Sequence, residues 1–247
     1  MIEAKLSHIN DGEDWFPSIK QIATCLNALK NKSSNIYVNA LDLISGVNRD
    51  LLNAANRNYE SYQEVEHSIN SKITNFELFI DEDLTNTISH FTNSIKKSVR
   101  IITTKCETLE EKKVNKIRGL LTEAVACSYL GDVRYFNQKN IIWDCSFYKD
   151  NELLYIRNEH DNKIFSTDIY YNNKIVNLCE CKTMPHFKTY QFEFMEYIKE
   201  EYEKEEIAVQ LYVFVLNFSR NPMVNTEMSK LTDNFELKTL DDIKAVV

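Results

Sequence analysis

The chain has 247 residues, of which 43% are hydrophobic and 27% are charged, as is typical of a water-soluble protein with one large domain or two small ones. No segment approaches the roughly 20 consecutive apolar residues of a membrane helix, and the first residues lack the apolar core of a signal peptide, so we expect a cytoplasmic protein without a membrane partner. The net charge of −8 argues against binding nucleic acid through overall charge, and such binding would require a local basic patch or a partner subunit.

The first 105 residues are interpreted as a helical region. Neither Gly nor Pro occurs between Gly46 and Gly119, and apolar residues recur with helical spacing in residues 41–52 and 73–80. The first helix is expected to begin near Pro17, because proline fits the first turn of a helix. These patterns leave the role of the region open between dimerisation, docking on a larger complex and DNA contact.

The rest of the chain, residues 106–247, alternates between helical and strand-like patterns. A helix is predicted from about Leu109 to Leu130, where Gly131 ends it. Four strands, a charged helix, a long apolar strand and a weak strand follow, at residues 141–148, 152–157, 164–171, 174–182, 189–204, 207–218 and 235–240, before a short C-terminal helix. This order predicts an α/β domain with a mixed sheet.

Residues 166–182 are predicted to form a β-hairpin. The Asn172–Asn173 pair suits a two-residue turn, because asparagine tolerates positive φ. Counting outward from this turn pairs Asp168 with Asn177. Asp168 would then lie a few residues along the sheet from Glu180, close enough to share a site if the two strands splay apart.

The second strand of this hairpin carries two charged residues on an otherwise apolar face. Side chains alternate along a strand, so Glu180 and Lys182 continue the face of Leu178. Charges that face a core are costly unless something pairs with them, and a divalent cation held by carboxylates would do so. The alternative is a surface ion pair between Glu180 and Lys182 on an edge strand, with Asp168 capping a turn. Other acidic-x-Lys tripeptides of the chain lie mostly in helical, loop or terminal contexts, so the strand context supports the site more than the tripeptide does.

Thr167-Asp168, followed after eleven residues by Glu180-Cys181-Lys182, resembles the bipartite signature of the PD-(D/E)XK, or restriction-endonuclease-like, nuclease superfamily. Threonine stands at 167 where that family has proline. By element order the resemblance covers residues 106–247. It implies an α/β fold with a mixed sheet, the αβββαβ core of that superfamily, preceded by the helical region 1–105.

The resemblance also implies roles for four residues. Asp168 and Glu180 would ligate Mg²⁺, which prefers oxygen ligands and for which Mn²⁺ is a possible substitute. Glu123, on the helix before the sheet, matches an acidic residue that many members have there, and would be an additional metal ligand or a water positioner. Lys182 would orient or deprotonate the attacking water and stabilise charge on the scissile phosphate. Asp144, on the first strand, is a competing acidic residue for the metal.

Basic residues gather ahead of Glu123, with eight of them between residues 96 and 118. The candidates for contact with nucleic-acid phosphates are Lys112, Lys113, Lys116 and Arg118. Acidic residues crowd the segment 193–206, and DNA should avoid that side. The alternative for both segments is a solvated helix face.

These observations predict a Mg²⁺-dependent endonuclease that hydrolyses phosphodiester bonds in DNA. By analogy with the family, restriction or anti-phage defence is the expected setting, with the chain acting as a homodimer or as a subunit of a larger complex. Two alternatives stay open, a non-catalytic interaction subunit that retains the nuclease fold and an RNA-cleaving nuclease on the same core.

Overall fold

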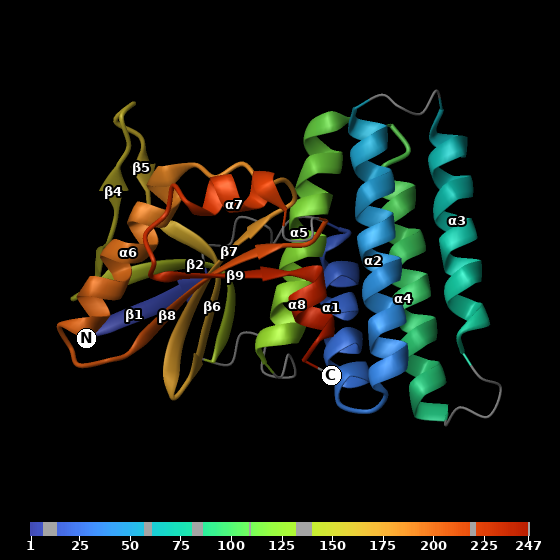
Figure 1. Ribbon diagram of the computed structural model, residues 1–247, viewed down its shortest axis with the longest axis horizontal. Coiled ribbons are helices and arrows are strands. Elements are labelled where there is room, and N and C mark those ends of the chain that lie inside the picture. Colours follow the sequence, from blue (N-terminus) through green and yellow to red (C-terminus); the bar gives the residue numbers. More distant parts are fainter. Residues whose placement is uncertain are drawn as a thin grey trace. The chain divides into compact units, whose positions relative to one another are not determined.

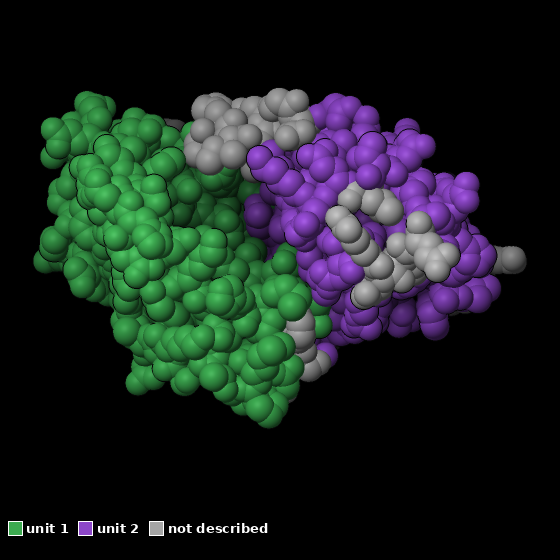
Figure 2. Space-filling view, turned by 90° about the horizontal axis from the view of Figure 1, so that it is seen from above, with its two compact units in different colours: residues 1–12, 133–239 green, residues 13–132, 240–247 purple. Residues whose placement is uncertain are grey.

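The computed structural model in Figure 1 describes residues 1–6, 14–56, 61–80, 86–108, 110–131, 140–217 and 221–246. The chain forms two compact units, which Figure 2 shows in different colours. The sheet unit comprises Met1–Gly12 and Val133–Thr239, and the helical unit comprises Glu13–Asp132 and Leu240–Val247. The predicted helix start at Leu109 and strand end at Phe218 lie outside the described residues. No helix in the described ranges combines the length and hydropathy that crossing a membrane requires.

The helical unit is a bundle in which α1 packs against α4 and α5, and α2 packs against α3 and α5. Its helices are α1 (Phe16–Lys30), α2 (Ser34–Ala55), α3 (Tyr62–Leu78), α4 (Asn86–Lys105), α5 (Glu111–Leu130) and α8 (Leu240–Lys244). Pro17 lies in the first turn of α1, so the predicted start of this helix is confirmed. Apolar side chains at helical spacing, such as Leu41 and Ile44 on α2, are fully buried, and they supply the hydrophobic contacts that hold the bundle together.

Gly46 lies in the middle of α2, where the sequence alone gives it no purpose. A Cβ atom at this position would lie 2.8 Å from Cδ of Lys72 on α3. The missing side chain lets Lys72 pass over α2 and place its Nζ 2.6 Å from Oδ2 of the buried Asp50. Glycine therefore costs some helix propensity here but allows an ion pair that joins α2 to α3.

The contacts divide the chain differently from the predicted boundary between residues 105 and 106. α5 buries Ile117 and Leu121 and packs against α1 and α2, so it belongs to the helical unit, as does α8. Conversely, β1 (Ile2–Leu6), at the start of the region predicted to be mostly helical, pairs with β2 (Ile141–Lys149) in the sheet. In both cases the partners are far away in the sequence, and local patterns do not reveal such partners.

The sheet unit contains a mixed sheet, so the predicted α/β class is confirmed. Its strand order is β1-β2-β6-β7-β8-β9, and β3 pairs with β2. After β1 come β2 (Ile141–Lys149), β3 (Glu152–Leu153), β6 (Ser166–Asn173), β7 (Ile175–Lys182), β8 (Val209–Val215) and β9 (Phe235–Thr239). The pairs from β1 to β7 are antiparallel, and β7-β8 and β8-β9 are parallel. A separate two-stranded sheet joins β4 (Ile156–Arg157) to β5 (Lys163–Ile164).

Two helices accompany this sheet, α6 (Thr189–Glu203) and α7 (Pro222–Met228). α6 presents Phe194, Met195 and Ile198 to the sheet, where they pack in one core with residues such as Leu178 and Val213. These three side chains are fully buried, and burying each stabilises the fold by roughly 1.5–3 kcal/mol. The packing fixes the start of α6 beside the C-terminal end of β7, where the charged residues lie.

The β6–β7 hairpin is confirmed, but the register predicted for it is wrong. Asn173 pairs with Ile175, and Lys174 forms the apex of the turn with a φ of 68°. Asn177 consequently pairs with Tyr171 and not with Asp168. Continuing the observed register brings Asp168 level with Glu180, so the two carboxylates are closer along the sheet than the sequence predicted.

Candidate active site

Asp168 and Glu180 lie on neighbouring strands at the point where the β6–β7 ladder stops. The last paired residues before them are Ile169 and Cys179. Beyond that pair, the backbone N–H of Cys181 donates a hydrogen bond of 2.6 Å to Oδ2 of Asp168. Beyond the last backbone pair, the aspartate side chain therefore serves as the acceptor that joins β6 to β7 beside Glu180.

Lys182 joins this pair of carboxylates from the same face of β7. Its Nζ donates to Oε1 of Glu180 at 2.6 Å and to Oε1 of Gln191, in the first turn of α6, at 2.8 Å. The side chains of Lys182 and Glu180 are only 15% and 3% exposed. β7 lies between β6 and β8, so the alternative of a surface ion pair on an edge strand is wrong.

The pKa values of Asp168 and Lys182 are shifted by burial and by neighbouring charges. Burial, followed by the negative charge of Glu180, raises the pKa of Asp168, and Lys182 and the Cys181 N–H oppose the rise. Burial acts to lower the pKa of Lys182, but the charges of Glu180 and Asp168 outweigh it and raise that pKa. Two carboxylates thus share one ammonium, and the cluster favours a further positive charge.

The donor set suits a hard divalent cation. Oδ1 of Asp168 and Oε2 of Glu180 accept no hydrogen bond from any residue in the described part of the chain. Magnesium is commonly bound through one or two carboxylates, with water and substrate phosphate completing its shell. Within the described ranges no three His, Cys, Asp or Glu side chains form a metal-binding group. The fit therefore depends on two protein carboxylates and not on a complete protein cage.

Asp144 lies level with Asp168 on the other side of β6. The pairs that flank it are Trp143 with Ile169 and Cys145 with Thr167. Its φ of 58° is unusual within a strand. The alternation of side chains along β2 is interrupted at this residue, because Ile142 and Cys145, which lie on either side of it, both contribute to the same core. The charge of Asp144 also raises the pKa of Asp168. The acidic residue considered as a competitor is therefore a neighbour of the site.

Gln191 is a site residue for which no role was predicted. Nothing in a pattern of single residues indicates that a glutamine nine positions after Lys182 turns back to it. The contact arises because α6 packs on the face of the sheet to which Glu180 and Lys182 belong.

Glu123 and the basic candidates belong to the helical unit. Glu123 lies on α5, where its Oε1 would be 3.9 Å from a Cβ at Gly119, and its place beside Asp168 and Glu180 stays a prediction.

Arg118 does not fit the predicted role in phosphate contact. It is 2% exposed, and its guanidinium donates to the carbonyl of Asn48 and to Oδ1 of Asn115. Burial lowers its pKa to about 10. Arg118 lies on the buried side of α5, which faces α2, so its role is in packing the helical unit. Lys112 is exposed and Lys113 and Lys116 are partly buried, and their contact with nucleic acid stays a prediction.

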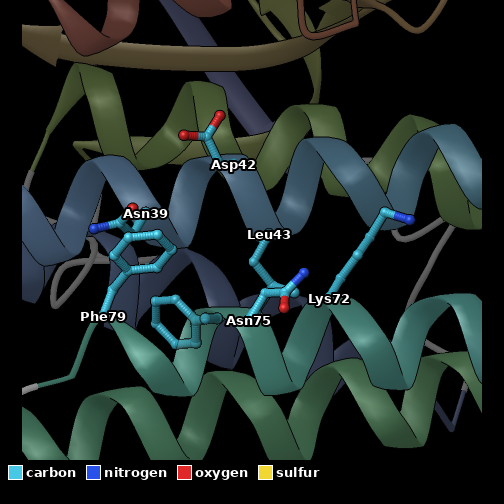
Figure 3. Close-up of a pocket in the computed structure, with 7 residues that line it drawn as sticks. Asn39, Asp42, Leu43, Lys72, Asn75 and Phe79 are labelled. Carbon is cyan, nitrogen blue, oxygen red and sulfur yellow. The ribbon is translucent and has the colours of Figure 1, made fainter.

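A pocket of about 270 Å³ lies in the helical unit, between α2 and α3 (Figure 3). It is lined by Asn39, Asp42, Leu43, Lys72, Asn75, Phe76 and Phe79. Its two charged groups already have partners, because Asp42 pairs with Lys244 and Lys72 with Asp50. The pocket lacks the uncompensated charge that the carboxylates of the sheet unit provide.

In comparisons with known proteins, no family model and no curated protein matches this sequence. The assignment of the site therefore depends on the residues of this chain and their geometry.

Proposed function

We propose that the sheet unit is a metal-dependent phosphodiesterase of the PD-(D/E)XK type that cleaves DNA. One observation carries the proposal: Asp168 and Glu180 lie level on adjacent strands, and the ammonium of Lys182 is hydrogen-bonded to Glu180 on the same face. A buried cluster of this composition has a clear use in phosphodiester hydrolysis, whereas its charges are costly in a purely structural role.

Each residue of the site would have a separate role in the reaction. Asp168 and Glu180 would hold Mg²⁺, which when bound polarises the phosphoryl oxygen and lowers the pKa of a coordinated water. The Nζ of Lys182 would orient the attacking water by hydrogen bonding and offset negative charge that develops on the phosphate. Gln191 keeps this ammonium at the site, and the N–H of Cys181 fixes the carboxylate of Asp168.

The test is incubation of the purified chain with supercoiled plasmid in the presence of Mg²⁺ or of a chelator. We expect nicked or linear DNA only with Mg²⁺, and a loss of at least a hundredfold in rate for Lys182→Ala. Lys238→Ala is the matched control, because Lys238 forms an analogous pair with Glu236 two residues away on β9. Cleavage by Lys182→Ala at the wild-type rate would refute the assignment.

The same assay with duplex DNA, single-stranded DNA and RNA of one sequence determines which nucleic acid is the substrate. Preference for RNA would favour the RNA-cleaving alternative. Failure of all three, in a chain that still binds divalent cations, would favour the non-catalytic interaction subunit. A restriction or anti-phage role, and action as a homodimer or as a subunit of a complex, complete the proposal by analogy with the family.

A further inference from the structure

Lys182 and Glu180 neutralise one another in the metal-free protein. Their 2.6 Å contact is almost fully buried, so water screens it little. A divalent cation that binds the carboxylate of Glu180 must share that negative charge with an ammonium already in contact with it. Cation binding and the Lys182–Glu180 ion pair therefore compete.

Gln191 gives the ammonium a second acceptor. Its Oε1 lies 2.8 Å from Nζ of Lys182, and the ring of Phe192 lies 6.0 Å from the same Nζ. An amide oxygen is neutral, so it holds a lysine without offering the charged ligand that a divalent cation seeks. If Lys182 loosens its contact with Glu180, Gln191 still satisfies one of its donors, which would otherwise be left buried without a partner.

We infer that this arrangement is a latch that regulates the site. In the metal-free protein Lys182 occupies the negative potential of Glu180, and an arriving divalent cation releases it onto Gln191. The ammonium then has a free donor directed at the site only when the cation is present. This inference rests on the proposed function and adds to it the element that couples cation binding to the lysine.

The experiment measures Ca²⁺ binding by calorimetry with the full chain, so that no turnover is involved. Lys182→Met removes the competing charge at similar side-chain length, and should bind Ca²⁺ at least tenfold more tightly than wild type. Gln191→Met removes the second acceptor, and should bind Ca²⁺ about three- to tenfold more weakly. In the Lys182→Met background, Gln191→Met should have no effect, because the residue acts only through the lysine.

Two controls keep the result interpretable. Lys238→Met removes a lysine of the same sheet that is paired with Glu236, and should leave Ca²⁺ affinity unchanged. Gln191→Asn keeps an amide on a side chain too short to reach Lys182, and should reproduce the weakening if Gln191→Met fails to fold. A ¹⁵N signal of the Lys182 ammonium that shifts on addition of Ca²⁺ reports the release directly.

Equal Ca²⁺ affinity in wild type and Lys182→Met would overturn the latch, as would the absence of Ca²⁺ binding in every variant. Additive effects in the double variant would overturn the role of Gln191. A chain that shows the coupling but cleaves no nucleic acid would retain the latch and lose the proposed function. Mg²⁺-dependent cleavage without the coupling would support the proposed function and overturn the latch.

Discussion

Replacing Asp168 by asparagine removes one of two negative charges that lie level on β6 and β7. Opposed side chains on neighbouring strands are about 5 Å apart, and two unit charges at that distance repel by roughly 3 kcal/mol at an effective dielectric constant of about 20. Asparagine retains an acceptor for the Cys181 N–H, but it loses the ionic part of that bond and the attraction to Lys182. We therefore expect a net gain of about 1–2 kcal/mol in the free energy of unfolding of the metal-free protein.

The gain in the free energy of unfolding of Asp168→Asn depends on pH, and the shift in the pKa of Asp168 determines its direction. Burial and Glu180 raise that pKa in the folded protein, so the stability that protonated Asp168 contributes is complete below its unfolded value of about 3.9 and is lost as pH rises through the folded pKa. Asp168→Asn should thus match wild type near pH 4 and exceed it increasingly at higher pH.

Thermal unfolding in the presence of a chelator checks this, with an expected increase in Tm at pH 7.5 of roughly 3–6 °C. Addition of Ca²⁺ should raise the Tm of wild type and leave that of the variant unchanged. Asp150→Asn, at an exposed position with a positive φ that asparagine tolerates, is the control and should show neither effect. A variant that melts below wild type at pH 7.5 without divalent cations would show that the charge of Asp168 is already compensated, and would refute the reasoning.

Two further predictions concern the packing of each unit. Phe194→Ala, at a fully buried position of α6, should lower the free energy of unfolding by about 3–5 kcal/mol, seen as a lower urea midpoint, and an unchanged midpoint would exclude α6 from the core. Gly46→Ala should cost about 1–3 kcal/mol by displacing Lys72 from Asp50. In a Lys72→Ala background the same substitution should cost little, and equal costs in both backgrounds would contradict the proposed steric conflict.

The sequence was sufficient to predict which side chains of a single strand or helix share one buried face. Strict alternation along β7 placed Glu180 and Lys182 on the face of Leu178, and this face is buried. Helical spacing likewise predicted the buried stripe of α2, to which Ile44 belongs, and the burial of Ile73 and Phe76 on α3. The predicted continuation of the second stripe to residue 80 is wrong, because α3 ends at Leu78 and Phe79 is 58% exposed. These properties depend on neighbours in the chain, so a local pattern contains them.

The register of the hairpin could not be predicted in the same way. Turn chemistry favoured the two asparagines, but the left-handed residue is Lys174, and the resulting shift moved Asp168 opposite Glu180. The left-handed φ of Asp144 is equally invisible in the sequence, because aspartate adopts that conformation only when surrounding structure requires it. The first feature depends on which residue of the turn takes the left-handed conformation, and the second lies on β2, which pairs with strands distant in the sequence.

Counting basic residues overestimates what the chain can offer to a phosphate backbone. Lys96 is paired with Glu77 at 2.8 Å and Lys105 with Asp14 at 2.5 Å, while Arg118 is buried. Each phosphate contact in nucleic-acid binding requires a cation that can replace the counterions of the phosphate, and these three residues are already committed. With a net charge of −8, the chain would then hold its substrate weakly through charge alone. A second copy or a partner subunit would supply the missing positive charge, in keeping with the assembly proposed above by analogy with the family.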